Sequence, residues 1–460
     1  MHALRLAIAV PFLAAAAAFA GAAPAQSAQS APGALRIGVA RVDITPRDLA
    51  GIIGIPNKPF VGVHDRIYAR ALIVNDGTTT AAIVSVDLVE YGDTSALRAR
   101  IARELAIPAD NVMIAASHNH SAPRGGPPTP GTSSVTQRRP WSSDAYTRQA
   151  DDTVVEALRK AKAAMQPARL SVGSGTVDVN TYRYALVDNR WRAGVNPAGP
   201  SDKTVWVLKF TNPQGEPIAL LMNYAVHPNV MAGSSAAEHQ YLIWRDISGA
   251  AEDYLEKHFQ DKVVAMWTLG AAGDQYAKFN KEFDKVWADT PAPELVDIQG
   301  AMIGLEVLQT AARMPPGVAA AHIDAAHRAV ACEMKAPAPA PAGGAAGGPG
   351  GGGPAAPADG RPAPGPAVKP GDKLDIQLGL IRINGTAITS VSGEVSTNIY
   401  AHLKKESPFK DTIMATLVND RAGYIPDEQN YERMGAAFVR GCAEGVIVDN
   451  LVDMMKATMQ

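Results

Sequence analysis

Cysteine is nearly absent from the sequence, with only Cys332 and Cys442 among 460 residues. This excludes a disulfide-rich scaffold and a cysteine-based metal site, because neither residue has another Cys or a His nearby at metal-ligand spacing. The two either pair in an oxidising compartment or remain as thiols. Charge of one sign is also lacking: 43 basic and 45 acidic residues give a net charge of −2. We therefore expect no nucleic-acid partner.

Long apolar runs are absent except at the start of the chain. Arg5 precedes the run LAIAVPFLAAAAAFA (6–20), and Ala23-Pro24-Ala25 then offers small residues at the spacing that a signal peptidase reads. This pattern predicts a signal peptide over residues 1–25 and a secreted or periplasmic protein that begins near Gln26. The alternative is an uncleaved N-terminal anchor. No later segment is long enough to cross a bilayer, so we expect no transmembrane segment in the mature protein.

One later segment has little besides Ala, Pro and Gly. Residues 336–370 cannot bury enough apolar surface to offset the entropy of ordering them, so the composition predicts disorder. Strand-like sequence stands on both sides, at 320–334 and 374–393. We therefore interpret the segment as an insertion within one domain that covers residues 26–460, rather than as a linker between two domains.

The remaining sequence alternates short β-rich runs with helical patterns, and it shows no internal repeat. The pattern predicts an α/β fold in which strands are sandwiched by helices. Strands are expected at 35–44, 68–75, 80–89, 111–117, 169–179, 204–211, 217–226 and 262–269. Helices are expected at 93–106, 144–165, 245–258, 294–313, 396–405 and 428–456.

Residues of metal-ligand type follow four apolar runs. His118 and His120 follow the first, His227 the second, Glu394 the third and Tyr424 the fourth. Ligands in open α/β sheets bind beyond the carboxyl ends of strands, and two His with one carboxylate form a common catalytic zinc set. Each residue alone also fits a structural role, as a hydrogen-bonded loop residue or as packing.

His239 follows soon after His227 in the sequence. Of the remaining histidines, it is therefore the one that we most expect to reach the site.

Seven segments, taken together and in order, resemble the neutral/alkaline non-lysosomal ceramidase family. They are RIGVARVDITP (36–46), GVHDRIYARALIVNDG (62–77), AIVSVDL (82–88), SHNHSAPRGG (117–126), NYAVHP (223–228), GEVST (393–397) and NDRAGYIPDEQNY (419–431). The resemblance runs from about residue 35 to 435. It implies a ceramidase-like catalytic domain, and it implies hydrolysis of amide bonds in small-molecule or lipid-like N-acyl substrates.

The resemblance also implies a set of site residues. His118, His227, Glu394 and Tyr424 match the positions that bind Zn²⁺ in that family, whereas His120 matches a residue that hydrogen-bonds the substrate. Arg183, in VNTYR, fits a second substrate-binding position. In such a site the metal activates a water molecule that attacks the carbonyl carbon.

The sequence departs from the family pattern at Tyr276. Gly273 and Asp274 are retained, but Tyr276 stands where the family has a serine to which a catalytic role has been assigned. A second family tyrosine has no counterpart near Ala436, and we expect the family's C-terminal immunoglobulin-like domain to be absent.

These residues favour an exported zinc-dependent amide hydrolase. Two alternatives stay open: a zinc hydrolase of another ester or amide, and a non-catalytic, metal-stabilised binding protein. The sequence does not define the acyl-chain preference or the oligomeric state.

Overall fold

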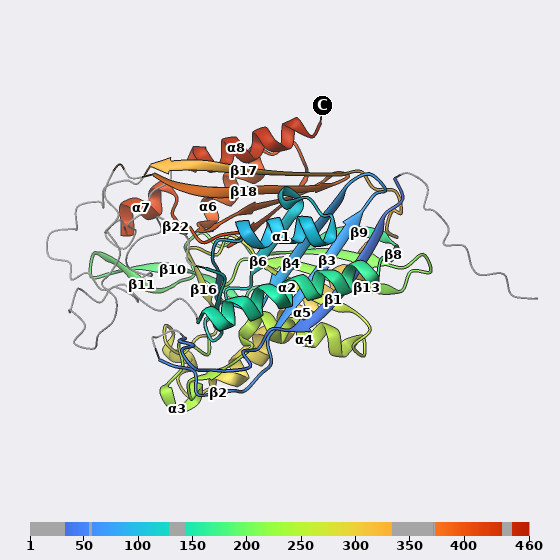
Figure 1. Cartoon of the computed structure of the whole chain (residues 1–460). Helices are drawn as coiled ribbons and strands as arrows, with labels where there is room; N and C mark the ends of the chain where they lie inside the picture. Colours follow the sequence, from blue (N-terminus) through green and yellow to red (C-terminus); the bar gives the residue numbers. More distant parts are fainter. Residues whose placement is uncertain are drawn as a thin grey trace, which may run out of the picture.

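Three mixed sheets with the same strand order form the body of the protein (Figure 1). In each sheet three consecutive strands pair antiparallel, and a fourth strand pairs parallel with the third. The first sheet contains β1 (Arg36–Asp43), β3 (Tyr68–Asn75), β4 (Thr80–Val86) and β6 (Val112–Ala116). The second contains β9 (Arg169–Thr176), β12 (Thr204–Thr211), β13 (Pro217–Tyr224) and β15 (Val264–Leu269). The third contains β17 (Ile323–Glu333), β18 (Lys373–Ile383), β19 (Thr386–Val391) and β21 (Asp411–Thr416).

Helices connect the strands in the same order in all three units. One helix joins the third and fourth strands, because a parallel pair needs a crossover connection, and a second helix follows the fourth strand. These helix pairs are α1 (Ser95–Leu105) with α2 (Asp144–Ala163), α4 (Asp246–His258) with α5 (Ala292–Arg313), and α6 (Thr397–Glu406) with α8 (Glu444–Ala457). The chain therefore repeats one β-β-β-α-β-α arrangement three times, although its sequence shows no internal repeat.

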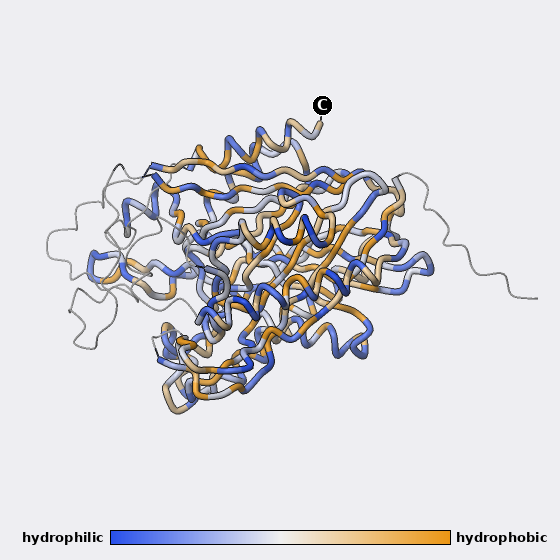
Figure 2. Tube along the Cα trace, viewed as in Figure 1, coloured by the Kyte–Doolittle hydropathy of each residue, from blue (hydrophilic) through white to orange (hydrophobic). Residues whose placement is uncertain are grey.

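The side-chain alternation of the strands divides the core into layers. Leu72, Leu208 and Ile388, one from each sheet, belong to a single central cluster. Their neighbours Ala71 and Val207 instead face the helices that cover the outside of their sheets. Each sheet thus lies between the shared centre and its own helices, which confirms the expected α/β fold with sandwiched strands. Figure 2 shows the same arrangement, with apolar strands inside and polar residues on the outer helices.

Close packing of helix on sheet requires glycine at one position of β1. A Cβ on Gly38 would lie 1.9 Å from the carbonyl oxygen of Ala161 in α2. Only a residue without a side chain allows α2 to lie this near to the sheet.

The computed structural model describes residues 33–54, 58–127, 143–333, 371, 373–434 and 444–459. The expected signal peptide and the segment 336–370 lie outside these residues, so both remain predictions. The strands that flank the segment pair directly, with Glu333 opposite Lys373. The segment therefore connects two neighbouring strands of one sheet, as expected for an insertion. Among the helices of the described ranges, none is long and apolar enough to cross a membrane.

The predicted strands and helices agree with the structure to within a few residues, with two differences. The helix expected at 428–456 is described as α7 (Glu428–Met434) and α8, and residues 435–443 lie outside the description. A further sheet, formed by β10 (Asn180–Val187), β11 (Arg190–Asn196) and β16 (Gln275–Ala277), was not expected from the sequence.

The remaining elements are short. They are β2 (Gly62–Val63), β5 (Glu90–Tyr91), β7 (Arg124–Gly125), β8 (Gln166–Pro167), β14 (Leu242–Ile243), β20 (Gly393–Val395), β22 (Gly423–Ile425) and α3 (Ala236–His239), with 3₁₀ turns at Ala109–Asn111 and Lys285–Trp287.

Candidate metal and substrate site

The carboxyl ends of strands from all three units meet at one place. His118 follows β6 of the first unit, and His227 follows β13 of the second. Glu394 lies in β20, directly after β19 of the third unit, and Tyr424 lies in β22, which comes after β21. β20 and β22 pair in parallel with Glu394 opposite Tyr424. Backbone contacts join the loops, since the N–H of His120 donates to the carbonyl of Pro228 at 3.0 Å.

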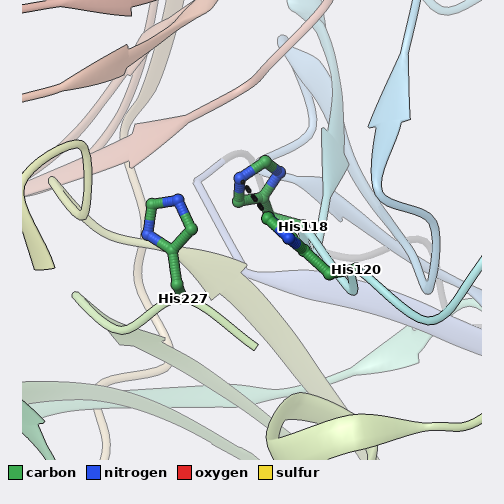
Figure 3. A group of neighbouring side chains, drawn as sticks. All are labelled: His118, His120 and His227. Atoms are coloured by element: carbon green, nitrogen blue, oxygen red, sulfur yellow. Dashed lines mark hydrogen bonds between the residues drawn. The ribbon is translucent and has the colours of Figure 1, made fainter. Parts of the chain in front are cut away.

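Two histidines converge on one carboxylate oxygen. The Nε2 atoms of His118 and His227 lie 3.3 and 3.2 Å from Oε2 of Glu394. His120 adds a third imidazole, with its Nε2 3.1 Å from Nε2 of His118. Figure 3 shows the three rings gathered, and their ligand atoms lie within 4.8 Å of one another. His118, His227 and Glu394 are at most 4% exposed, whereas His120 is partly accessible.

The backbone around His118 fixes which ring nitrogen faces the cluster. His118 has a left-handed backbone with φ of 65°, and Nδ1 lies 2.7 Å from the carbonyl oxygen of Val89. A carbonyl can only accept, so Nδ1 carries the ring proton when the imidazole is neutral. The Nε2 lone pair then points at Glu394, as in a histidine held for a metal by an outer hydrogen bond.

The electrostatics separate the charged from the neutral groups. Burial opposes ionisation of Glu394, but the adjacent rings of His118 and His227 hold its pKa well below the usual range. Burial lowers the pKa of His227 to about 4 and, together with the neighbouring histidines, takes the pKa of His120 well below its ordinary value. Burial also acts to lower the pKa of His118, but the Glu394 carboxylate outweighs it and raises that pKa.

The donor set fits a metal ion of the zinc type. Two buried imidazoles and a carboxylate from separate loops are ordinary zinc donors, and a catalytic site leaves further positions for water and substrate. Nδ1 of His227 is buried without a hydrogen-bond partner among the described residues. Because Nε2 of the same ring faces Glu394, Nδ1 is the ring nitrogen that is turned away from the cluster.

Arg183 lies in β10 with its guanidinium enclosed by tyrosines. Its Nε and Nη2 donate to the hydroxyl of Tyr184 at 3.1 and 3.0 Å, and Nη1 donates to the hydroxyl of Tyr424 at 3.2 Å. The guanidinium carbon lies 5.4 Å from the centre of the Tyr276 ring. Arg183 is thus brought to the same site as Tyr424.

Asp274 anchors the loop that precedes Tyr276. Its buried carboxylate accepts from the N–H and hydroxyl of Thr397 at 3.0 and 2.8 Å and from Nδ2 of Asn430 at 2.9 Å. Its carbonyl accepts from the N–H of Arg183 at 3.0 Å. Asp274 thus joins α6, α7 and β10, and its carbonyl positions the backbone of Arg183.

Tyr276 itself lies beside the histidines. Its ring stacks on Phe283 at 4.0 Å, lies 6.2 Å from the His227 ring and is 5% exposed. The residue that replaces the family serine therefore occupies space at the edge of the site.

Sequence reasoning missed a buried ion-pair group next to the site. Oε2 of Glu90 accepts from Nε of Arg124 at 3.0 Å, and its Oε1 lies 2.5 Å from Nε of Arg421. The two arginines belong to the segments that carry the histidine pair and Tyr424. The signal was present, because Glu90 follows the apolar run of β4 in the same way that the expected ligands follow theirs.

His239 contacts the site loop without joining the group of convergent nitrogens. It is buried in α3, and its Nε2 lies 3.2 Å from Oγ of Ser121 in the histidine segment. It therefore supports the loop from outside the cluster.

One protein family matches just over half of the chain. The family described as neutral/alkaline non-lysosomal ceramidase, N-terminal, matches residues 35–283. This chain belongs to that family.

Individual relatives agree with the family assignment. The chain is 26% identical over 238 residues to neutral ceramidase A of Dictyostelium discoideum, a match covering 48% of this chain and 32% of the relative. It is 27% identical over 258 residues to the neutral ceramidase of Pseudomonas aeruginosa, a match that covers 53% of this chain and 37% of that relative. These matches thus span about a third of the length of the curated relatives.

Solved structures extend the similarity in fold to nearly the whole chain. A ceramidase complexed with C2 superposes with a TM-score of 0.70 at 19% identity, covering 93% of this chain and 75% of that one. The crystal structure of neutral ceramidase from Pseudomonas aeruginosa gives a TM-score of 0.68 at 17% identity, and the match covers 92% of this chain and 74% of that one.

Proposed function

We propose that this protein is an exported, zinc-dependent hydrolase of the amide bond in N-acyl, ceramide-like substrates. His118, His227, Glu394 and Tyr424 are the metal ligands in this proposal. The observation that carries it is the approach of two buried imidazole nitrogens to one oxygen of Glu394, at 3.3 and 3.2 Å. Membership of the ceramidase family and the signal-like sequence at 1–25 support the reaction class and the export.

Protons compete little with a metal for Glu394 and His227, whereas at His118, whose pKa Glu394 raises, a metal ion competes with a proton. Glu394 remains ionised because its pKa is far below neutrality, and His227 remains neutral because burial lowers its pKa. When bound, a zinc ion polarises a carbonyl group and lowers the pKa of water from about 15.7 to about 7. The surrounding side chains exclude bulk water, which strengthens every electrostatic interaction within the site.

His120 and Arg183 are the residues that contact the substrate in this proposal. His120 is neutral and partly accessible, and its Nε2 lies 3.1 Å from Nε2 of His118; when a metal occupies the His118 nitrogen, this contact gives way to a hydrogen bond with the substrate. Arg183 is permanently charged, and its bonds to Tyr184 and Tyr424 aim it at the site. It stabilises negative charge that develops on the carbonyl oxygen, a contribution of about 10²–10³ in rate for one such donor.

A zinc hydrolase of a smaller ester or amide is the second candidate. The bulk of Tyr276 beside His227 favours it, because the phenol ring takes up space at the site that a serine would leave open.

The test is turnover of a panel of N-acyl amides and esters of increasing chain length by the purified protein. Activity should disappear with a chelator and return with zinc. His118→Ala should lose bound metal and lower the rate by at least about 10³-fold. The matched control His322→Ala removes a histidine that is 67% exposed, and it should behave as wild type.

Activity that survives in His118→Ala or in chelator would contradict the proposal. Bound zinc without turnover of any substrate would favour the non-catalytic binding protein instead.

A further inference from the structure

The β10–β11 hairpin has a buried base and an exposed apolar end. At the base, Arg183 and Tyr184 are buried at the site, whereas Leu186 is 55% and Val187 44% exposed. In Figure 1 the hairpin extends from the left of the molecule, away from the three sheets. A single strand therefore runs from the site to an apolar surface.

The two faces of the hairpin end combine apolar and basic side chains. Leu186 is opposite Trp191, so these two share one face of the ribbon. Val187 is opposite Arg190 and Ala185 is opposite Arg192, which places both arginines on the other face. Both arginines are exposed.

The end of the hairpin is held in one shape. Asp188 and Asn189 form its turn with φ of 51° and 56°, the positive pair of a type I′ turn, whose twist matches that of paired strands. The guanidinium carbon of Arg433 lies 4.3 Å from the centre of the Trp191 ring, and this contact holds the indole in place. The apolar end of the hairpin therefore loses little conformational entropy when it binds.

Neighbouring exposed Leu and Val, an adjacent Trp and flanking Arg are the composition of a segment that binds a lipid interface. Apolar side chains insert at the boundary of headgroups and acyl chains, Trp prefers that boundary, and Arg attracts anionic headgroups. Asp188 is the single acidic residue between positions 180 and 196. The exposed charge of the hairpin end is thus positive, although the whole chain carries −2.

We propose that the end of the β10–β11 hairpin, defined as Leu186, Val187, Arg190, Trp191 and Arg192, docks the protein on an anionic lipid surface. This inference rests on the proposed function, since it supplies a lipid-like substrate to that site. Val187 lies on the same face of β10 as Arg183, four residues away, which is about 13 Å along a strand. A lipid-like substrate beside the docked hairpin therefore has its amide group near the site. Its acyl chain can remain in the lipid at that stage.

The test measures flotation of the purified full chain with vesicles of phosphatidylcholine, with and without phosphatidylglycerol. Wild type should float with the anionic vesicles. Leu186→Ser/Val187→Ser should weaken binding by about tenfold or more, because two apolar side chains that would insert into the lipid are lost. Arg190→Gln/Arg192→Gln should remove the preference for phosphatidylglycerol, at about fivefold in affinity for each arginine. Leu305→Ser, at a residue of α5 that is 46% exposed, is the matched control and should bind as wild type.

Turnover separates this proposal from the proposed function. The hairpin variants should hydrolyse a soluble short-chain N-acyl substrate as wild type does, and should be at least about tenfold slower on a long-chain substrate in vesicles. Vesicle binding that depends on the hairpin, without turnover of any substrate, supports the docking surface and contradicts the proposed function. Wild type that does not float, or variants that float equally well, would overturn the docking surface. A dimer in solution that Leu186→Ser dissociates would also overturn it, by assigning the surface to a second copy of the chain.

Discussion

The backbone of His118 shows how one residue is prepared for metal binding. A left-handed conformation is costly for a residue with a side chain, and it persists only where the surroundings determine it. Here the N–H of Ser117 donates to the carbonyl of Val86 at 2.9 Å, and the ring of His118 is bonded to Val89. Val86 ends β4, and Val89 lies in the short connection from β4 to β5. The local strain is therefore offset by the strand next to β6.

The ring of Tyr276 should limit the length of acyl chain that the site accepts. Tyr276→Ser should shift preference towards longer acyl chains, by about tenfold in the ratio of kcat/KM for long and short substrates, because the phenol ring no longer fills the edge of the site. It should also cost about 3 kcal/mol of stability through the lost stacking on Phe283. Tyr276→Phe is the matched variant, since it keeps the ring and removes only the hydroxyl.

The kinetics of these two variants distinguish the effect of the ring's volume on chain-length preference from the effect of the Tyr276 hydroxyl. If Tyr276→Phe shifts the chain-length preference as much as Tyr276→Ser does, the ring is not what limits the acyl chain. If wild type is inactive and Tyr276→Ser is active, the proposed mechanism is wrong, because it needs no serine at this position.

At the scale of elements, Glu90 holds together the loops that carry the site. It is 3% exposed and pairs with Arg124 and Arg421, from the loops after β6 and β21. Its neighbour Val89 accepts the hydrogen bond from His118. The β5–β7 pairing, with Glu90 opposite Arg124, fixes the same geometry through the backbone.

Removing the charge of Glu90 should therefore loosen two loops at once. Glu90→Gln keeps the shape of the side chain but removes the negative charge that Glu90 shares with two buried arginines, which should cost up to about 3–5 kcal/mol of unfolding free energy. The variant should also bind zinc about 10–100-fold more weakly, the usual effect of removing a residue that supports a ligand. Chemical denaturation and competition with a chelator measure the two effects.

Glu104→Gln is the matched control for this substitution. Glu104 pairs with Arg100 on the exposed surface of α1, where such a pair contributes at most about 1 kcal/mol. Equal effects from the two variants would contradict the structural role of Glu90.

The elements that the sequence predicted well are those with strong local signals. Runs such as 204–211 and 217–224 match the predicted strands, because buried strands read as continuous β-branched and apolar sequence. The β10–β11 hairpin was missed because polar and aromatic residues interrupt its alternation. Its Asp188-Asn189 turn also lacks the glycine that usually marks a type I′ turn.

At the scale of the whole molecule, the threefold repeat explains why the site forms where it does. Each unit turns the carboxyl ends of its parallel strands towards the same place, and each contributes a residue there: His118, His227 and Glu394. The residue types and their positions at strand ends were readable from the sequence. Their convergence was implied by the family resemblance and by no local pattern, because it depends on the packing of three sheets around the central cluster.

The same packing predicts that residues 336–370 are dispensable. Glu333 and Lys373 are already opposite each other in the β17–β18 pair, so a short Gly-Ser connection can close the hairpin. Shortening the loop should change the unfolding free energy by at most about 2 kcal/mol, in the stabilising direction. Thermal melting and metal content of the deletion variant, beside wild type, measure this. Loss of folding would show that the segment is structural.

The most direct test of the account is anomalous diffraction at the zinc absorption edge from crystals of the full chain grown with zinc. We expect a strong peak about 2.0–2.2 Å from ligand atoms of His118, His227 and Glu394, with the hydroxyl of Tyr424 as the remaining protein ligand. Four intact side chains with no peak between them, or a zinc ion bound at another place, would contradict it.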